Sequence, residues 1–380
     1  MPSASRFMPR AAWIAVLVLA VSIIYIVKIA HRMPDFEVYQ RAAIRARAAQ
    51  QLYRPDDGHY VFKYLPAFAV AAVPIGALPD AAARATWFGC SVALLALLLT
   101  LSLAILPDRR RRGAVLVATT FVLLAKFYAH ELELGQVNIL MAALIVAAAR
   151  EMRVGSEGAA GFLVAAAVVV KPYAVLFLPY LVARRRVTSL ATAAAGLLAA
   201  LLFPAIVYGF AGNLRLLQGW WATVSESTAP NLMDANNVSA ASVFARALGP
   251  GRPAQILAFL MVLALLTAAA FVFTRRRALP FPEGLEIALL LTMVPIISPQ
   301  GWDYVFLVST PGVMYLVNYR DALPGYLRTA VIVALLVIAF SIFDLMGRPA
   351  YYMFMRLSII PAAYLVVIAG LVMLRVRRVC

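Results

Sequence analysis

The sequence predicts an all-α, polytopic membrane protein whose helices form a single membrane-embedded domain over residues 1–380. Hydrophobic residues make up 64% of the chain and charged residues only 13%, which is too apolar for a soluble domain. Several apolar runs approach the length of about 20 residues that a helix needs to cross a bilayer. Short arginine clusters separate these runs. We interpret these clusters, in a chain of net charge +17, as topology signals and lipid-headgroup contacts rather than as a nucleic-acid surface.

The first apolar run, residues 11–30, predicts a retained transmembrane helix rather than a cleaved signal peptide. Arg6 and Arg10 precede it and no small-residue cleavage site follows it, so its amino end should stay in the cytoplasm. Cys90 lies inside another apolar run and Cys380 is the last residue. The sequence therefore indicates no disulfide framework.

The arginine clusters predict the remaining topology, because basic loops stay in the cytoplasm. The clusters are Arg109–Arg112, Arg150 with Arg153, Arg184–Arg186, Arg275–Arg277, Arg320, and Arg375 with Arg377 and Arg378. Keeping all of them on one side requires crossings over residues 84–106, 113–129, 137–150, 187–210, 254–274, 283–298, 303–318, 325–345 and 354–374. Between residues 158 and 183 the chain must leave and return, which predicts two short or broken helices around Lys171-Pro172. The total is about twelve crossings.

The run Leu65–Leu78 does not fit as a crossing. It has only 14 residues and contains two prolines, and counting it would place the four consecutive arginines outside. We therefore expect a re-entrant or interfacial segment there. The predicted domain then consists of the first span, an external loop, a helical module, a second long external loop and the C-terminal helices, at residues 11–30, 31–83, 84–210, 211–253 and 254–380.

Asp35 is the first candidate functional residue, because it lies just after the first span in the stretch HRMPDFEVYQ. It follows Pro34 and precedes a helix-favouring stretch, so its carboxylate could instead be a helix cap that accepts backbone N–H bonds. Arg41 and Arg45 lie four residues apart on the predicted helix. There they could contact lipid headgroups or hold the phosphate of a lipid-linked substrate. The pattern alone leaves both interpretations open.

Other polar candidates lie beside apolar runs or in external turns. Lys63 could be a snorkelling side chain, whereas Lys171 lies within a predicted span, where a cation is costly and indicates function. An ordinary solvated turn and an interfacial aromatic belt are the structural alternatives for the turns. The spacing of these residues matches no metal-binding motif, and the sequence contains no DxD pair, Walker loop or GxSxG motif. The turn candidates are His130, Gln136 and Asn138 in HELELGQVN, and Asp303 in SPQGWDYVF.

Taken in order, five blocks of the sequence resemble glycosyltransferase family 87, the bacterial polyprenyl-phosphate-mannose-dependent transferases. The blocks are DFEVYQRAA, LYRPDDGHYVFKYLPAFAVAAVPIGALP, GQVNILMAALIVAAA, KPYAVLFLPYLVARRR and SPQGWDYVFLV, and they cover about residues 31–310. The resemblance implies the GT-C fold, a membrane-embedded helical bundle whose first external loop carries juxtamembrane helices and the catalytic acid. It also implies an enzyme of the bacterial inner membrane with its active site facing the periplasm or exterior.

Carried over to this sequence, the resemblance implies that Asp35 is a general base for an acceptor hydroxyl. The implied donor is a polyprenyl monophosphate sugar, the acceptor is a lipid or glycan, and no metal or other cofactor is needed. The candidate contacts for the donor phosphate are Arg41, Arg45, Lys63 and Lys171. The candidates for the sugar or acceptor site are His130, Gln136, Asn138 and Asp303.

Two departures from the family pattern leave the sugar open. Asp303 stands where many relatives have a histidine, and Asn236-Asn237-Val238-Ser239 stands where many have Asn-Gln-Ser. We expect mannose, with arabinofuranose, galactose or another hexose as alternatives. Two other classes of function also fit, namely a transporter or flippase of lipid-linked sugars and a non-catalytic envelope-assembly subunit. An internal repeat would favour the transporter, and the sequence has no obvious one.

Overall fold

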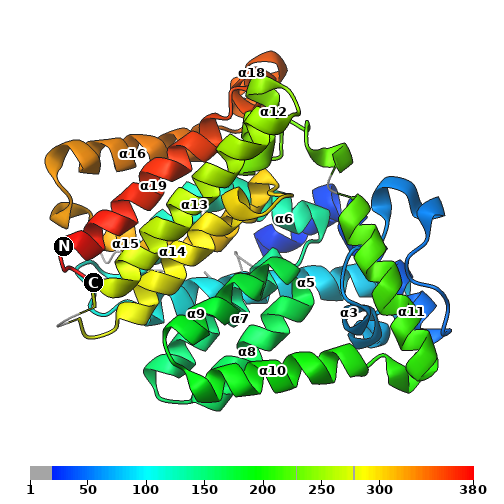
Figure 1. The fold of residues 1–380 in the computed structure, drawn as a ribbon. Helices are drawn as coiled ribbons and strands as arrows, with labels where there is room; N and C mark the ends of the chain where they lie inside the picture. Colours follow the sequence, from blue (N-terminus) through cyan, green and yellow to red (C-terminus); the bar gives the residue numbers. More distant parts are fainter. Residues whose placement is uncertain (1–18, 228, 277–278) are drawn as a thin grey trace, which may run out of the picture.

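A computed structural model describes residues 19–227, 229–276 and 279–380. These residues form helices and loops, with one isolated bridge between Asn237 and Trp302 as the only strand-like pairing within the described ranges. The predicted all-α class is confirmed (Figure 1). The first turns after residue 18 continue into a short π-helix, η1 (Tyr25–Ile29).

Eighteen α-helices and five short 3₁₀ turns follow η1 along the described chain. The α-helices are α2 (Pro34–Arg47), α3 (Pro66–Ala71), α4 (Val73–Gly76), α5 (Asp80–Ala104), α6 (Gly113–Leu134), α7 (Asn138–Arg153), α8 (Glu157–Val170), α9 (Phe177–Ala183), α10 (Val187–Leu202), α11 (Ala205–Glu226), α12 (Ala240–Leu248), α13 (Arg252–Thr274), α14 (Pro282–Ile297), α15 (Thr310–Tyr319), α16 (Gly325–Phe340), α17 (Phe343–Met346), α18 (Arg348–Arg356) and α19 (Ile359–Val376). The 3₁₀ turns are η2 (Pro55–Tyr60), η3 (Pro172–Leu176), η4 (Ala229–Asn231), η5 (Asp303–Ser309) and η6 (Arg320–Ala322).

Four helices of the described chain, α5, α6, α13 and α19, are long and apolar enough to cross a membrane. The bent pair of α10 and α11 could supply a fifth crossing. The predicted count of about twelve is not confirmed, because helices such as α8 and α16 have only 14 and 16 residues. Residues 11–18 of the first predicted span lie outside the described residues, and its remainder is apolar and helical.

Two predicted interruptions are confirmed, and proline explains both. The run Leu65–Leu78 folds as the short helices α3 and α4, each of which has a proline in its first turn. The segment 158–183 divides at Lys171, whose extended backbone separates α8 from η3 and α9. Pro172 cannot continue α8, because it lacks the backbone N–H and disfavours helical geometry in the residue before it.

The arginine clusters gather at one end of the bundle, as their predicted common side requires. Arg111 pairs with Asp321 at 2.5 Å, Arg153 donates to the Ala104 carbonyl at 2.9 Å, and Arg184 donates to the Phe273 carbonyl at 3.0 Å. Helices α6 and α10 both begin directly after a cluster and lead to the opposite end (Figure 1). We call these two ends the basic end and the polar end, because the candidate polar side chains lie at the second.

The centre of the bundle is α14, in which every residue from 283 to 296 is buried. Helix α7 packs against α14 on one side and against α5 and α8 on the other. Glu286 of α14 is fully buried and accepts ion pairs from Arg184, Arg276 and Arg375 at 2.8–3.0 Å. A buried carboxylate requires such partners, because an unpaired charge in an apolar interior is strongly destabilising. This ion network ties α14 to α9, α13 and α19 at the basic end.

The segment after η1, residues 31–83, packs on itself through α2. Gly76 of α4 packs so closely on α2 that an added Cβ would lie 2.8 Å from the Cβ of Ala43. Arg45 binds Asp57 through two hydrogen bonds of 2.5 and 2.8 Å, and Arg41 adds a third contact at 3.3 Å. These bonds hold η2 against the carboxyl-terminal half of α2.

Replacing Asp57 by Asn is expected to lower the free energy of unfolding by about 1–2 kcal/mol, because a charge-assisted bidentate pair is lost. The hydrogen bonds from Arg45 and Arg41 lower the pKa of Asp57 below its ordinary value of 3.8. The pair therefore stabilises the protein fully above that value, and its contribution is lost as pH falls through the lowered pKa. Thermal unfolding of the wild-type and Asp57→Asn proteins in detergent at pH 7 and pH 3 tests this. The same difference in unfolding temperature between the two proteins at both pH values would contradict the expected loss of the pair at low pH.

Candidate active site

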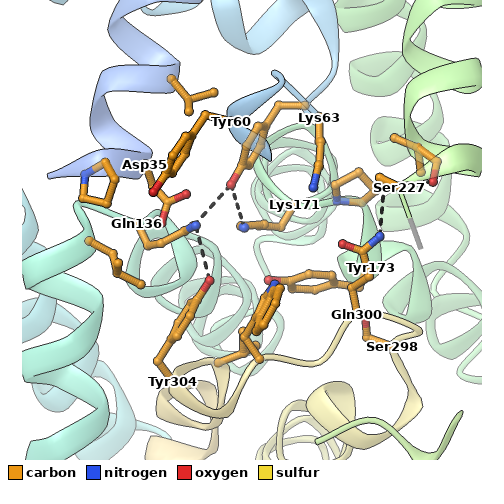
Figure 2. A pocket seen from close by; sticks show the side chains of 18 of the residues that line it. Asp35, Tyr60, Lys63, Gln136, Lys171, Tyr173, Ser227, Ser298, Gln300 and Tyr304 are labelled. Carbon is orange, nitrogen blue, oxygen red and sulfur yellow. Dashed lines mark hydrogen bonds between the residues drawn. The ribbon is translucent and has the colours of Figure 1, made fainter. Parts of the chain in front are cut away.

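A cavity of about 490 Å³ opens at the polar end of the bundle. Six segments of the chain line it, and Figure 2 shows their side chains converging. They are the start of α2 with Asp35 and Tyr39, the loop with Tyr60, Lys63 and Tyr64, the end of α6 with His130 and Gln136, the α8–η3 break with Lys171 and Tyr173, and two loops with Ser227, Asn236, Ser298, Gln300, Trp302, Asp303 and Tyr304. Six of the nine predicted site residues therefore lie together here, namely Asp35, Lys63, His130, Gln136, Lys171 and Asp303.

Asp35 is the second residue of α2 and its half-buried side chain lines the cavity. The N-cap of α2 is Met33, with no side-chain cap bond, so the helix-cap interpretation of Asp35 is wrong. Burial raises the pKa of the Asp35 carboxyl, while a hydrogen bond from Gln136 and the charges of Lys171, His130 and Lys63 oppose that rise. The carboxylate is therefore partly desolvated yet surrounded by positive charge.

Lys171 occupies the break between α8 and η3, from which its ammonium group reaches the cavity (Figure 2). The Lys171 Nζ donates to the Tyr64 hydroxyl at 2.8 Å and lies 4.7 Å from the centre of that ring. Lys63 also extends into the cavity (Figure 2), and burial lowers the pKa of its ammonium group while Asp35 opposes that change. The two ammonium groups thus share the cavity with the Asp35 carboxylate, which suits an anionic ligand beside a proton acceptor.

A chain of hydroxyl and amide groups connects these charges. The Tyr64 and Tyr39 hydroxyls lie 2.6 Å apart, and both donate to the Gln136 side-chain oxygen, at 3.2 and 2.9 Å. The Gln136 amide nitrogen donates to the Tyr304 hydroxyl at 3.5 Å. Burial raises the pKa of Tyr64, so its hydroxyl stays neutral and accepts from Lys171. Gln136 is therefore held on one side by tyrosines and presents its amide to Asp35.

His130 and Asp303 form a second polar group on the cavity wall. The His130 Nδ1 lies 3.7 Å from the Asp303 Oδ1, and its ring packs edge-on against Tyr304. Asp303 is only 3% exposed, and within the described chain its Oδ1 has no hydrogen-bond partner. A buried carboxylate oxygen without a hydrogen-bond donor is unusual, and the polar group that faces this one is the His130 ring.

The remaining three predicted residues do not line the cavity. Asn138 is fully buried behind it, where it bonds to Glu131 at 2.8 Å and accepts from the Tyr173 hydroxyl. It therefore holds the cavity residue Tyr173 in place. Arg41 and Arg45 bind Asp57 instead, so their assignment as contacts for a phosphate in this cavity is not retained. Both arginines lie on α2 as predicted, but Asp57 in the following turn binds both guanidinium groups.

The sequence pattern predicts no role for the tyrosines that join the charged groups. Tyr64 lies next to Lys63 in the quoted block VFKYLP, which was the available signal, but an aromatic residue in an apolar chain usually indicates packing. No three His, Cys, Asp or Glu side chains converge as a metal site anywhere in the part of the chain that the structure describes.

Replacing Tyr64 by Phe is expected to lower turnover about tenfold, which corresponds to one hydrogen bond to a charged group. The ring would remain, but Lys171 would lose its hydroxyl acceptor. The matched control is Tyr208→Phe, which removes a hydroxyl bonded to the Gln50 carbonyl outside the cavity. Initial rates of the Tyr64→Phe and Tyr208→Phe proteins test this. Equal rates in the two variants would show that the Tyr64 hydroxyl has no role in turnover.

Comparisons with known proteins cover several of these cavity residues. The family model described as glycosyltransferase family 87 matches residues 62–299, which include Lys63, His130, Gln136 and Lys171. A search of solved structures finds similarity to ArnT from Cupriavidus metallidurans bound to undecaprenyl phosphate. That similarity has 16% sequence identity and a TM-score of 0.40, and it covers 97% of this chain and 79% of the other. A search of curated proteins finds no match.

Proposed function

Because the chain belongs to glycosyltransferase family 87, we propose that it transfers a sugar from a polyprenyl-phosphate-linked donor to a lipid or glycan acceptor. We further propose mannose as the sugar, and the extracytoplasmic side of a bacterial inner membrane as the location of the reaction. The observation that carries the proposal is the Asp35 carboxylate in a cavity with the ammonium groups of Lys63 and Lys171. The cavity's position at the end remote from the arginine clusters supports the proposed side.

In the proposed reaction, Asp35 is the general base and the two lysines bind the donor phosphate. The acceptor hydroxyl oxygen bonds to the anomeric carbon as the bond from that carbon to the phosphate oxygen breaks. The hydroxyl proton moves to Asp35, and the negative charge that develops on the leaving phosphate is stabilised by the ammonium groups. A single displacement inverts the anomeric centre, so a β-linked donor gives an α-glycoside.

The raised pKa of Asp35 is useful for this role. A base is most effective when its pKa approaches the working pH, and burial moves a carboxyl in that direction. The charges of Lys171 and Lys63 oppose the rise in pKa and so favour the ionised form that accepts a proton. The proposed sugar contacts are His130, Gln136 and Asp303, whose nitrogen and oxygen atoms offer both hydrogen-bond donors and acceptors to hydroxyl groups.

A transfer assay tests the proposal. The purified protein, reconstituted in lipid, is supplied with polyprenyl-phosphate sugars that carry radiolabelled mannose, galactose or arabinofuranose, together with a bacterial membrane-lipid extract. We expect label to move from the mannose donor to a new product with an α-linkage. Failure with every donor by a folded protein would contradict the proposal and favour movement of lipid-linked sugars across the membrane.

A further inference from the structure

Helix α11 has a different orientation from the helix that precedes it. Helix α10 begins after Arg186 at the basic end, and α11 follows it at an angle of 89°, with the non-helical backbone at Gly209. In Figure 1, α11 crosses the far end of α10 instead of continuing it. If α10 runs across the membrane from the basic end, a helix at right angles to it lies in the plane of the membrane.

Beyond Gly209, where the backbone leaves helical geometry, α11 has three distinct sides. Asn213 and Leu216 are buried against the protein. Phe210, Leu214 and Trp221 are 73%, 52% and 67% exposed, and they lie within about 40° of one another around the helix axis.

The third side of α11 is polar. Arg215 and Gln218 are exposed, and they lie about 40–100° further round the helix axis than the apolar stripe formed by Phe210, Leu214 and Trp221. A packed side, an apolar side and a polar side on one helix match the three surroundings of an interfacial helix, which are protein, acyl chains and headgroups with water.

We propose that α11 is an in-plane helix whose apolar stripe is embedded in the leaflet at the carboxyl end of α10. Water does not suit this face, because three large apolar side chains would be exposed side by side. The bend, the adjacent polar side and the tryptophan in the stripe favour the membrane interface, where tryptophan is enriched. Arg215 on the polar side would contact lipid phosphates.

The packed side of α11 joins this membrane contact to the cavity. The Trp220 Nε1 donates to the Lys63 carbonyl at 3.2 Å. Gly219 faces Tyr53, where an added Cβ would lie 3.1 Å from the ring, and the Tyr53 hydroxyl donates to the Tyr64 carbonyl at 2.6 Å. Helix α11 therefore supports the loop whose side chains Lys63 and Tyr64 line the cavity.

The carboxyl end of α11 reaches the cavity itself. Val224 in its last turn and Ser227 just after it line the cavity wall, and Ser227 accepts a hydrogen bond from Gln300 at 3.0 Å. If α11 lies in the interface, the cavity mouth lies at the depth of the lipid headgroups. A ligand with an anionic headgroup on a membrane-embedded chain could then enter without leaving the leaflet.

Site-directed spin labelling of the full chain tests the position of α11. In a Cys90→Ser background, Leu214→Cys and Gln218→Cys each receive a nitroxide, and the protein is placed in nanodiscs of phosphatidylethanolamine and phosphatidylglycerol. Collisions with oxygen report the acyl region, and collisions with a water-soluble nickel chelate report the aqueous phase. We expect the oxygen-to-chelate collision ratio at residue 214 to be about tenfold higher than at residue 218.

Phe210→Cys, on the same stripe as Leu214, is a second test should one variant fold poorly, and the protein without an introduced cysteine measures labelling of Cys380. Similar ratios at residues 214 and 218 would overturn the proposal. Spin–spin broadening at residue 214 that disappears on dilution with unlabelled protein would also overturn it, because a second copy of the chain would then cover the stripe.

Discussion

Replacing Asp35 by Asn is expected to reduce sugar transfer by about 10²–10⁴-fold, the range typical of a lost general base. The amide has nearly the same shape but cannot accept the acceptor's proton. Because Asp35 makes no cap bond in α2, the substitution should leave the helix intact. Initial rates of purified wild-type and variant proteins with a polyprenyl-phosphate sugar measure the loss.

The matched control for this substitution is Glu37→Gln, on the same turn of α2. Glu37 pairs with Arg84 at 2.9 Å and does not line the main cavity, so its loss should leave the transfer rate nearly unchanged. An Asp35→Asn protein that unfolds at the wild-type temperature and transfers sugar at the wild-type rate would remove Asp35 as the base. Equal losses in both variants would point to disruption of α2 instead.

The pH profile of the wild-type enzyme should reflect the same group. A base works in its deprotonated form, so the rate should rise with pH, and the raised pKa of Asp35 moves this rise above the ordinary range of an aspartate. The pKa of Lys63 is lowered, so a fall in rate at high pH should begin below the ordinary lysine value of 10.5 if its charge is required. The Asp35→Asn protein should lack the rising limb.

Replacing Lys171 by Gln is expected to reduce turnover by about 10²–10³-fold, as when one preorganised donor to a developing charge is removed. Gln keeps a hydrogen-bond donor for Tyr64 but not the positive charge. The effect should fall mainly on kcat, because negative charge on the phosphate increases as its bond to the sugar breaks. Steady-state kinetics at varied donor concentration separate kcat from KM.

Lys126→Gln provides a matched control for Lys171→Gln. Lys126 is also a half-buried lysine, but it donates to the Ser341 carbonyl and hydroxyl at 3.0 and 2.6 Å and does not line the cavity. Its replacement should change turnover far less. Wild-type kcat in a folded Lys171→Gln protein would show that the phosphate does not depend on this cation, and the same measurement on Lys63→Gln would then identify its partner.

Local features of the fold could be predicted from the sequence where one residue type determines the backbone. Pro66 and Pro74 predicted the interruption that became α3 and α4, and Pro172 predicted the break at Lys171. The arginine clusters predicted that α6 and α10 both begin at the basic end. The number of crossings could not be predicted in this way, because helices such as α14 are buried among other helices and need not have full membrane length.

The site could be predicted where charge stands out against an apolar background, as at Asp35, Lys63 and Lys171. Arg41 and Arg45 show the limit of that signal, because their partner Asp57 lies in a loop whose fold the sequence pattern does not predict. Tyr39 and Tyr64 had no signal of their own. Their hydroxyls donate to Gln136, which is distant from both in the sequence, so this role is visible only in the folded structure.

The ion network around Glu286 has a consequence for how the chain is made. A glutamate in the apolar helix α14 opposes transfer from the insertion machinery into lipid. Arg184 and Arg276 precede Glu286 in the chain, so both are synthesised before α14 enters the membrane. Arg375, which is fully buried, arrives last with α19. The order of translation thus supplies Arg184 and Arg276 as countercharges before Glu286 enters the membrane, and Arg375 pairs with Glu286 afterwards.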